Sequence, residues 1–291
     1  MIEYVTPSTI DEALAVLAAH PNQARILAGG TDLLVDLRDG KMQAQVLVDI
    51  TRIPALNQIQ VGGRSVEVGA AVTFATVKNY EYFQNHVPML AEAAGSVGAP
   101  GIQNSATWVG NLLQAMPAAD GAIVALALEA EVRVIEPAGA DWRPVTTIFA
   151  GPGRSAIDSS WQLITHLRFP IPPAAWGTAW QRIGRRSALT LPIINCAVKL
   201  ELDRDRIQHA AVALGPVAST PFRARAAESF LEGKPPTEEM FEQAGQIAQG
   251  ESMPRSNPLR ASREYRLAII PVVVRRALRI AAGRARGWKS Q

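Results

Sequence analysis

The residues of this 291-residue chain with the clearest capacity to bind a ligand form a glycine turn, Gly29–Gly30–Thr31–Asp32. The turn follows a short strand predicted at Arg25–Ala28 and precedes an apolar-faced helix predicted at Thr31–Arg38. Two glycines allow close backbone approach and positive φ, and the first turn of a helix has unpaired N–H groups. The pattern indicates an anion cradle in which a pyrophosphate meets several donors and the positive end of the helix dipole. The alternative is an ordinary turn in which Asp32 caps the helix.

A second candidate is the loop Thr107–Trp108–Val109–Gly110–Asn111, which Pro117–Asp120 follows. Glycine and asparagine in a polar loop, then an acid at the start of an apolar helix, suit the polar part of a cofactor. Asp120 has a simpler alternative, because a carboxylate in the first turn of a helix is favourable without any ligand.

Other catalytic patterns are missing from the sequence. The four histidines have no partner at helical spacing, and nucleophile-elbow, phosphate-loop and HExxH motifs do not occur. The segment Gly151–Ala156 resembles a dinucleotide motif, but its proline indicates a surface turn. Cys196 is the one cysteine, so this chain alone cannot hold a cysteine-ligated iron–sulfur cluster. Hydrolase and NTPase functions are therefore not favoured.

Composition and charge indicate a folded chain with a boundary near Pro170–Pro173. Apolar residues make up 48% and charged residues 19%. Lys and Arg number 10 against 16 Asp and Glu in residues 1–175, and 19 against 10 in residues 176–291. We expect two domains with these bounds, the first divided near residue 57 into subdomains of about 1–57 and 58–175. We expect a cytoplasmic protein without a membrane span, and no nucleic-acid partner.

The periodicity predicts mixed helix and strand along the whole chain. A helix capped by Thr9 is expected to end before Pro21, and Thr73 is expected to cap a helix over about 74–83. Residues 95–111 are expected to be loop-like. The other elements predicted in the first part are strands at Val46–Ile50, Val66–Val68 and Ala130–Ile135 and helices at Pro88–Gly95 and 117–129. The second part is expected to contain strands at Thr178–Ile183, Ile193–Leu202 and Ile207–Leu214, with a tight hairpin turn at Asp203–Arg204–Asp205, and helices at Pro236–Ala248 and Ser262–Ala282.

Taken together, several segments resemble the FAD-binding medium subunit of the molybdenum hydroxylases, the group of carbon monoxide dehydrogenase and xanthine dehydrogenase. The segments are AGGTDLL at 28–34, GAAVT at 69–73, TWVGNLLQAMPAAD at 107–120, GPGRSA at 151–156 and the stretch 180–194. The resemblance extends from the first residues to the C-terminal helix. It implies an α+β chain: a two-subdomain FAD-binding fold of the PCMH type, then a C-terminal antiparallel sheet with helices.

The resemblance also implies which residues contact FAD. In members of the family, an AGGTDL-type loop and a T-x-G-G-N loop hold the FAD diphosphate. An acidic residue reaches a hydroxyl of the FAD. In this sequence these roles fall on Ala28, Gly29, Gly30, Thr31, Asp32, Leu33 and Leu34, on Thr107, Trp108, Val109, Gly110 and Asn111, and on Asp120, with Thr73 near the cofactor.

Some positions depart from the family pattern. Val109 stands where a glycine is common, so its Cβ is expected to displace the backbone or narrow the flavin cleft. Gln103–Asn104 replaces Arg–Asn, and Thr190 replaces an Asp. Trp180 and Arg182 occupy the positions of a Tyr-x-Lys pair. Trp180 either stacks on or gates the cofactor, or it only packs within a strand. Arg182 either keeps the functional positive charge of the lysine or is merely solvated.

The function implied is electron transfer within a heteromeric complex. Electrons leave the substrate at a molybdopterin-binding large subunit, cross the [2Fe–2S] clusters of a small subunit, and pass through FAD to an external acceptor. The substrate, the acceptor and the subunit stoichiometry are not determined by the sequence. Two alternatives stay open: a flavin-free assembly subunit that retains the fold, and a self-contained flavin oxidase.

Overall fold

The N-terminal segment forms a small parallel sheet in the computed structural model, which describes residues 1–173, 175–186 and 188–287. The strand order is β1-β3-β2, and the apolar residues of β3 are buried. Helix α1 begins where the sequence predicts, because the Thr9 hydroxyl accepts a hydrogen bond from Glu12 N at 3.1 Å. The elements are β1 (Glu3–Val5), α1 (Ile10–Ala19), β2 (Ala24–Leu27), α2 (Leu33–Arg38), β3 (Val46–Asp49), η1 (Ile50–Arg52) and η2 (Pro54–Asn57).

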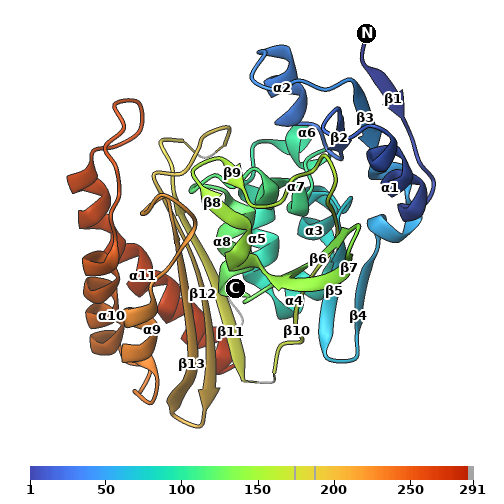
Figure 1. Ribbon diagram of the computed structural model, residues 1–291. Coiled ribbons are helices and arrows are strands. Elements are labelled where there is room, and N and C mark those ends of the chain that lie inside the picture. Colours follow the sequence, from blue (N-terminus) through green and yellow to red (C-terminus); the bar gives the residue numbers. More distant parts are fainter. Residues whose placement is uncertain (174, 187, 288–291) are drawn as a thin grey trace.

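An antiparallel five-stranded sheet follows, with the order β4-β5-β10-β6-β7. A group of helices precedes β6 in the chain (Figure 1). The strands are β4 (Ile59–Gly62), β5 (Ser65–Gly69), β6 (Glu131–Glu136), β7 (Gly139–Pro144) and β10 (Leu163–Pro170), with a hairpin of β8 (Phe149–Gly151) and β9 (Arg154–Ser155) after η3 (Val145–Ile148). The helices are α3 (Phe74–Asn79), α4 (Glu81–His86), α5 (Pro88–Ser96), α6 (Pro100–Gln103), α7 (Trp108–Leu113) and α8 (Asp120–Ala127).

Three local predictions in this region were wrong. The single helix expected over 74–83 is divided into α3 and α4, because Tyr80 adopts an extended conformation with ψ 113°. The loop expected over 95–111 contains α6 and α7. The buried helix starts at Asp120 and not at Pro117, because Ala119 is extended with ψ 111°. Tertiary contacts determine each of these helix boundaries, and the local sequence pattern does not reveal where they lie.

The C-terminal part is an antiparallel sheet of order β11-β12-β13-β14 with helices α9, α10 and α11 on one side (Figure 1). The predicted turn between β12 and β13 is confirmed, because Asp203 pairs with Arg206 and Arg204 has φ +55°. Helix α9 was not predicted. The elements are β11 (Trp176–Ile183), β12 (Ile194–Asp203), β13 (Arg206–Gly215), β14 (Phe222–Arg223), α9 (Arg225–Leu231), α10 (Glu238–Glu251) and α11 (Arg263–Ala285).

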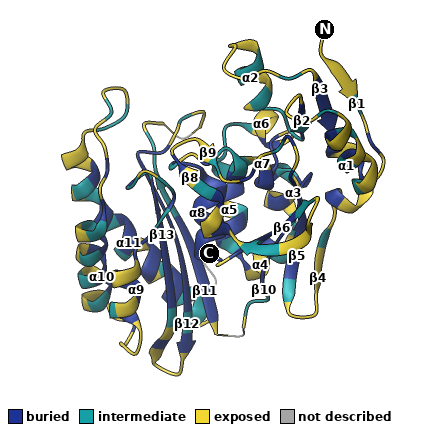
Figure 2. Ribbon diagram, viewed as in Figure 1, coloured by how far each residue is buried: buried dark blue, intermediate teal, exposed yellow. Residues whose placement is uncertain are grey.

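Both faces of this C-terminal sheet are buried (Figure 2). Ala179 packs with the apolar residues of α10 and α11, whereas Trp176 and Trp180 belong to the apolar core of the N-terminal part. Several ion pairs also connect the parts, among them Lys199 with Glu129 at 2.5 Å and Arg284 with Glu92 at 2.5 Å. The sheet therefore holds both halves of the chain together. Among the described helices, none has the length and apolar character needed to cross a membrane.

Candidate functional site

The glycine turn lies directly against the loop that leads into the second predicted motif. A Cβ added to Gly29 would stand 2.0 Å from Ser105 O and 2.8 Å from Ala106 Cα, so only glycine fits. Ser105 and Ala106 immediately precede Thr107 in the sequence. The structure thus brings together two loops that are separated by more than seventy residues.

The glycine turn presents a row of backbone N–H groups without acceptors. In the described part of the chain, no hydrogen bond uses the N–H groups of residues 29 to 33. The carbonyl oxygens of Gly30 and Asp32 accept from Leu34 N and Asp36 N at 3.1 and 3.0 Å, which starts α2. Gly30 has φ +68°. Successive free amides at the start of a helix are what a diphosphate requires, so these residues fit that group.

The side chains of this turn leave the amides accessible. Asp32 is exposed and its side chain makes no capping hydrogen bond. The alternative of an ordinary turn in which Asp32 caps the helix predicts such a bond, so it is not supported. Its carboxylate instead accepts from the Thr31 hydroxyl at 3.4 Å. Leu34 is 48% exposed, while Ala28 and Leu33 are half-buried.

Thr73 and Thr107 lie side by side and cap neighbouring helices. They form an isolated antiparallel bridge in which Phe74 N donates to Ala106 O at 2.9 Å. The Thr73 hydroxyl accepts from Thr76 N at 3.2 Å, as the sequence predicts, and the Thr107 hydroxyl accepts from Gly110 N at 3.1 Å. Thr107 is buried, so its hydroxyl holds the loop in shape from within.

The second loop also fixes the start of α8. Trp108 Nε1 donates to Gly121 O at 2.9 Å, and Asn111 Oδ1 accepts from Gly121 N at 3.0 Å. A Cβ on Gly121 would stand 2.7 Å from Asn111 Oδ1, so this position also requires glycine. Trp108 and Asn111 therefore hold the backbone beside Asp120, while the exposed Gly110 lies at the surface of the loop.

Two departures from the family pattern have a structural role. Val109 is only 3% exposed and its side chain packs in the apolar core, so its Cβ does not narrow the surface of the loop. Gln103 is buried and donates to Gly95 O and Val97 O at 3.0 and 2.9 Å. It closes the turn before α6 without carrying a charge.

Asp120 connects the N-terminal helix α8 to the C-terminal sheet. Asn195 Nδ2 donates to Asp120 Oδ1 at 2.5 Å, and Arg182 Nε lies 3.3 Å from Asp120 Oδ2. Burial raises the pKa of Asp120, and the charge of Arg182 and the Asn195 hydrogen bond lower it in part, which leaves a pKa of about 6. At neutral pH the carboxylate is therefore mainly ionised and paired with Arg182.

Arg182 and Trp180 occupy the same face of β11 but different surroundings. Arg182 donates through Nη2 to Thr190 O and pairs with Asp120, so it is not merely solvated. Trp180 is 7% exposed and lies in the core of the N-terminal part, which agrees with the packing interpretation. Its indole N–H has no acceptor among the described residues.

Sequence reasoning missed Ser105, Gly121 and Asn195. Of these, Asn195 had a signal in the sequence, because it is a polar amide within the apolar run of β12. The structure shows it fully buried, where an amide needs hydrogen-bond partners. Gly121 follows the predicted site residue Asp120, and its role depends on the close approach of the Asn111 side chain, which the sequence does not report. Ser105 has no local signal, since its role comes from the approach of Gly29.

Comparison with known proteins identifies the family. A family model described as the FAD binding domain in molybdopterin dehydrogenase matches residues 1–172. A second, the CO dehydrogenase flavoprotein C-terminal domain, matches residues 179–281. The chain is 30% identical over 285 residues to the xanthine dehydrogenase FAD-binding subunit of Escherichia coli O157:H7, with 98% of this chain and 97% of the relative covered. It is 29% identical to the carbon monoxide dehydrogenase medium chain of Hydrogenophaga pseudoflava, with 97% of each covered.

Solved structures agree with the sequence relatives. Carbon monoxide dehydrogenase from Hydrogenophaga pseudoflava superimposes with a TM-score of 0.91 at 30% identity, over 97% of this chain and 98% of that one. Quinoline 2-oxidoreductase from Pseudomonas putida 86 gives a TM-score of 0.89 at 26% identity, over 98% of both chains. The predicted α+β fold class and the FAD cofactor are thereby confirmed. The chain belongs to the family of FAD-binding medium subunits of the molybdenum hydroxylases, which are oxidoreductases.

Proposed function

We propose that this chain holds FAD between the glycine turn and the second loop and passes electrons through it to an external acceptor. The observation that carries the proposal is the contact of Gly29 with Ser105 beside the free amides of residues 29 to 33. Those amides bind the diphosphate through hydrogen bonds to its oxygens and through the positive end of α2. Ala28, Leu33 and Leu34 form the apolar border of the same turn.

The remaining predicted residues support this site from three sides. Thr73, Thr107, Trp108, Val109, Gly110 and Asn111 shape the second loop and the first turn of α7. Asp120 accepts a hydrogen bond from a hydroxyl of the FAD, with Asn195 and Arg182 fixing the direction of its carboxylate. Trp180 supports this arrangement from the core below.

Electron transfer needs only binding and orientation from this chain, because bound FAD itself supplies one- and two-electron redox chemistry. Cys196 is the single cysteine and is fully buried, and burial raises the pKa of its thiol. A [2Fe–2S] cluster takes four protein ligands, so the clusters belong to a small partner subunit. The molybdenum centre belongs to a large partner subunit, which oxidises the substrate.

We assign these tasks to two domains. Residues 1–175 form the FAD-binding domain, divided near residue 57, and residues 176–291 form the C-terminal domain. The family models meet between residues 172 and 179, which supports this division. Residues 174, 187 and 288–291 lie outside the described part of the chain.

The test is the flavin content of the purified full-length chain. We expect an absorption spectrum of bound oxidised flavin, and about one FAD per chain after heat extraction. Co-expression with the large and small subunits should then give substrate-dependent reduction of an added acceptor, and removal of FAD should abolish it. A folded chain that takes up no added FAD would contradict the proposal and favour the flavin-free assembly subunit. Turnover by the isolated chain would favour a self-contained oxidase.

A further inference from the structure

Both ends of helix α8 are tied to the C-terminal sheet by ionic contacts. At its first residue, Asp120 pairs with Arg182 of β11. Beyond its last turn, the carboxylate of Glu129 lies 2.5 Å from Lys199 Nζ on β12 and 2.9 Å from His209 Nε2 on β13. The contact at this second end therefore includes a histidine, the side-chain type whose charge changes most readily near neutral pH.

Glu129 ends α8 in a left-handed conformation and uses its side chain to hold the sheet. Its φ is +55°, where glycine is the usual residue after a helix, and its N–H donates to Leu126 O at 3.0 Å. Burial would raise the pKa of Glu129, but Lys199, His209 and Arg223 lower it to about 2. The carboxylate is therefore ionised at neutral pH, and its contacts with the sheet offset the unfavourable backbone conformation.

His209 lies between carboxylates on both sides of its ring. Nδ1 is 3.2 Å from Glu232 Oε1, and Nε2 is 2.9 Å from Glu129 Oε2. A third carboxylate, that of Glu201, belongs to the cross-strand neighbour of His209 on β12. A neutral imidazole has one N–H and one lone pair, so one nitrogen would face a carboxylate oxygen without a proton between them. Only a ring with protons on both nitrogens donates to both carboxylates.

The charges around His209 balance when its ring is positive. Three bases and four acids are joined to one another and to His209 by contacts of 4.0 Å or less, namely Lys199, Arg223 and Arg225 with Glu129, Glu201, Glu228 and Glu232. Lys199 and Arg223 are only 3% and 5% exposed, so solvent screens an excess charge poorly here. Arg206 and Lys234, exposed bases on the same side, contact a backbone carbonyl and an aromatic ring instead. A proton on His209 therefore supplies the missing positive charge.

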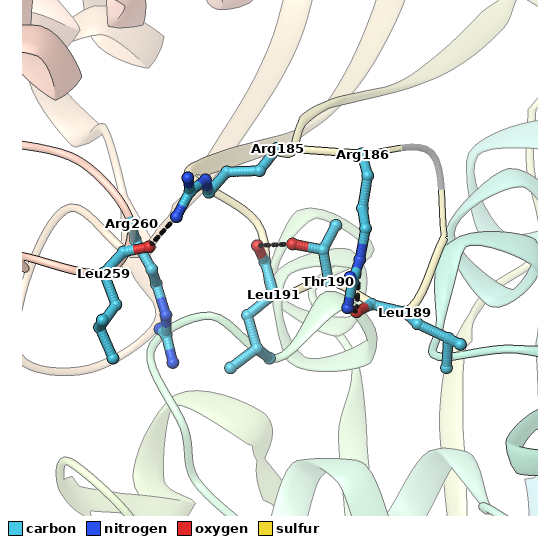
Figure 3. Close-up of a pocket in the computed structure, with 7 residues that line it drawn as sticks. All are labelled: Arg185, Arg186, Leu189, Thr190, Leu191, Leu259 and Arg260. Atoms are coloured by element: carbon cyan, nitrogen blue, oxygen red, sulfur yellow. Dashed lines mark hydrogen bonds between the residues drawn. The ribbon is translucent and has the colours of Figure 1, made fainter.

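A second group of bases in the described part of the chain has no such matching acids. Arg185, Arg186 and Arg260 line one cavity (Figure 3), and none of them has a carboxylate within 4.0 Å. Arg185 Nη1 donates to Leu259 O at 2.7 Å instead. The pairing of every base around Glu129 with a carboxylate is thus a particular property of that cluster.

We infer that His209 is a proton-dependent clasp between the FAD-binding part and the C-terminal part of the chain. With protons on both ring nitrogens, it bridges Glu129 at the end of α8 to Glu232 after α9. Loss of one proton removes one bridge and leaves the cluster with an excess negative charge. The folded state thus holds this proton more tightly than the unfolded chain does, so the stabilisation is present at lower pH and is lost as the pH rises.

The first test is NMR of the full-length chain labelled with nitrogen-15 histidine. The signals of His209 are those missing from His209→Gln. At pH 7 we expect protons on both ring nitrogens of His209, and in Glu232→Gln the second proton should be lost at a lower pH than in the parent chain. A His209 ring with a single N–H at pH 7, or the same titration in parent and variant, would overturn the clasp.

The second test is urea unfolding at pH 6 and at pH 8. The unfolding equilibrium constant of the parent chain, divided by that of His209→Gln, should rise at least about threefold between these pH values. The control is His86→Gln, because His86 is exposed, packs on Tyr82 and has no carboxylate within 4.0 Å among the described residues. For this control the ratio should stay constant. An unchanged ratio for His209→Gln, or an equal change in both variants, would refute the inference.

The clasp and the proposed flavin function are tested separately. Neither measurement needs bound FAD, so a chain that takes up no flavin still reports on His209. FAD content should be the same in the parent chain and in His209→Gln, and loss of the clasp in both tests would leave the flavin proposal standing.

Discussion

The carboxylate of Asp120 and the guanidinium of Arg182 form an ion pair, with Oδ2 3.3 Å from Nε, between helix α8 and strand β11. Little of either side chain is exposed, 7% for Asp120 and 11% for Arg182. A buried carboxylate needs a partner, and here the partner comes from the other half of the chain. The site residue expected at the start of α8 is therefore oriented by the C-terminal sheet.

Lowering the pH should stabilise the parent chain relative to Asp120→Asn. The pKa of Asp120 is raised from 3.8 to about 6, so between these values the folded state binds a proton that the unfolded state does not. The free energy of unfolding of the parent chain, minus that of the variant, should increase by about 1–2 kcal/mol from pH 7 to pH 5. Urea unfolding at both pH values measures this difference. An unchanged difference would contradict the raised pKa.

Arg182→Gln should cost more stability than Arg182→Lys. The glutamine variant leaves Asp120 buried beside no cation, and breaking such a pair costs about 3–5 kcal/mol at neutral pH. Lysine keeps the positive charge but loses the hydrogen bond from Arg182 Nη2 to Thr190 O, so a smaller loss of stability is expected. Thermal unfolding at pH 7 orders the three proteins. Equal stability of the two variants would mean that the charge at this position is unimportant.

Gly29→Ala should reduce bound FAD at least tenfold. Its new Cβ would stand 2.0 Å from Ser105 O, so the two loops must separate. FAD content after gel filtration is the measurement, and circular dichroism reports whether the chain folds. Gly250→Ala in α10 is the control, because no atom lies within 4 Å of its Cβ, and full FAD content is expected. If Gly29→Ala does not fold, Gly30→Ala replaces it, because the atoms nearest to its Cβ belong to the side chains of Leu27 and Leu34 and the remaining strain comes from its φ of +68°.

Trp108→Phe should lower the free energy of unfolding by about 1–3 kcal/mol. The ring stays in the core, but Gly121 O loses the indole donor at 2.9 Å. Trp161 is 43% exposed, so Trp161→Phe should change stability by about 0.5 kcal/mol or less. Urea unfolding of both variants at one pH gives the comparison. A loss of equal size in the two would show that the buried hydrogen bond contributes nothing.

Lys199→Met should destabilise the chain at pH 7 and much less near pH 2. Burial would raise the pKa of Glu129, but the hydrogen bond and charge of Lys199, with help from His209 and Arg223, bring it down to about 2. This stabilisation is present above pH 4.5 and is lost as the pH falls towards 2. We expect a loss of about 1–2 kcal/mol at pH 7, since Glu129 is partly exposed. Lys234→Met, at an exposed position, is the control.

Elements with strong local signals were predicted well. The Thr9 cap places the start of α1, and the Asp203–Asp205 turn places the hairpin of β12 and β13, because both depend on residues within one or two turns. The start of α8 lies at Asp120, although the helix was expected to begin at Pro117. It depends on the hydrogen bonds of Gly121 to Trp108 and Asn111, which lie ten or more residues away.

The residues of the candidate site likewise fall into those that the local sequence indicated and those that only the tertiary structure revealed. The glycines at positions 29 and 30 indicated an anion cradle from their type and order. Val109 suggested a narrowed loop, yet its side chain is buried, because the direction of a Cβ depends on how α7 packs. Asn195 entered the site only through the pairing of β12 with β11 and its approach to α8.

The sequence by itself determined the class of chain, the two loops and the lack of cysteines for an iron–sulfur cluster, since these follow from residue type, order and count. Only the tertiary structure decided that Gly29 meets Ser105, that Arg182 pairs with Asp120, and that arginines from two distant segments surround one cavity. The reason is physical: free amides and unpaired charges acquire their partners from chain segments that meet only after the sheets have packed.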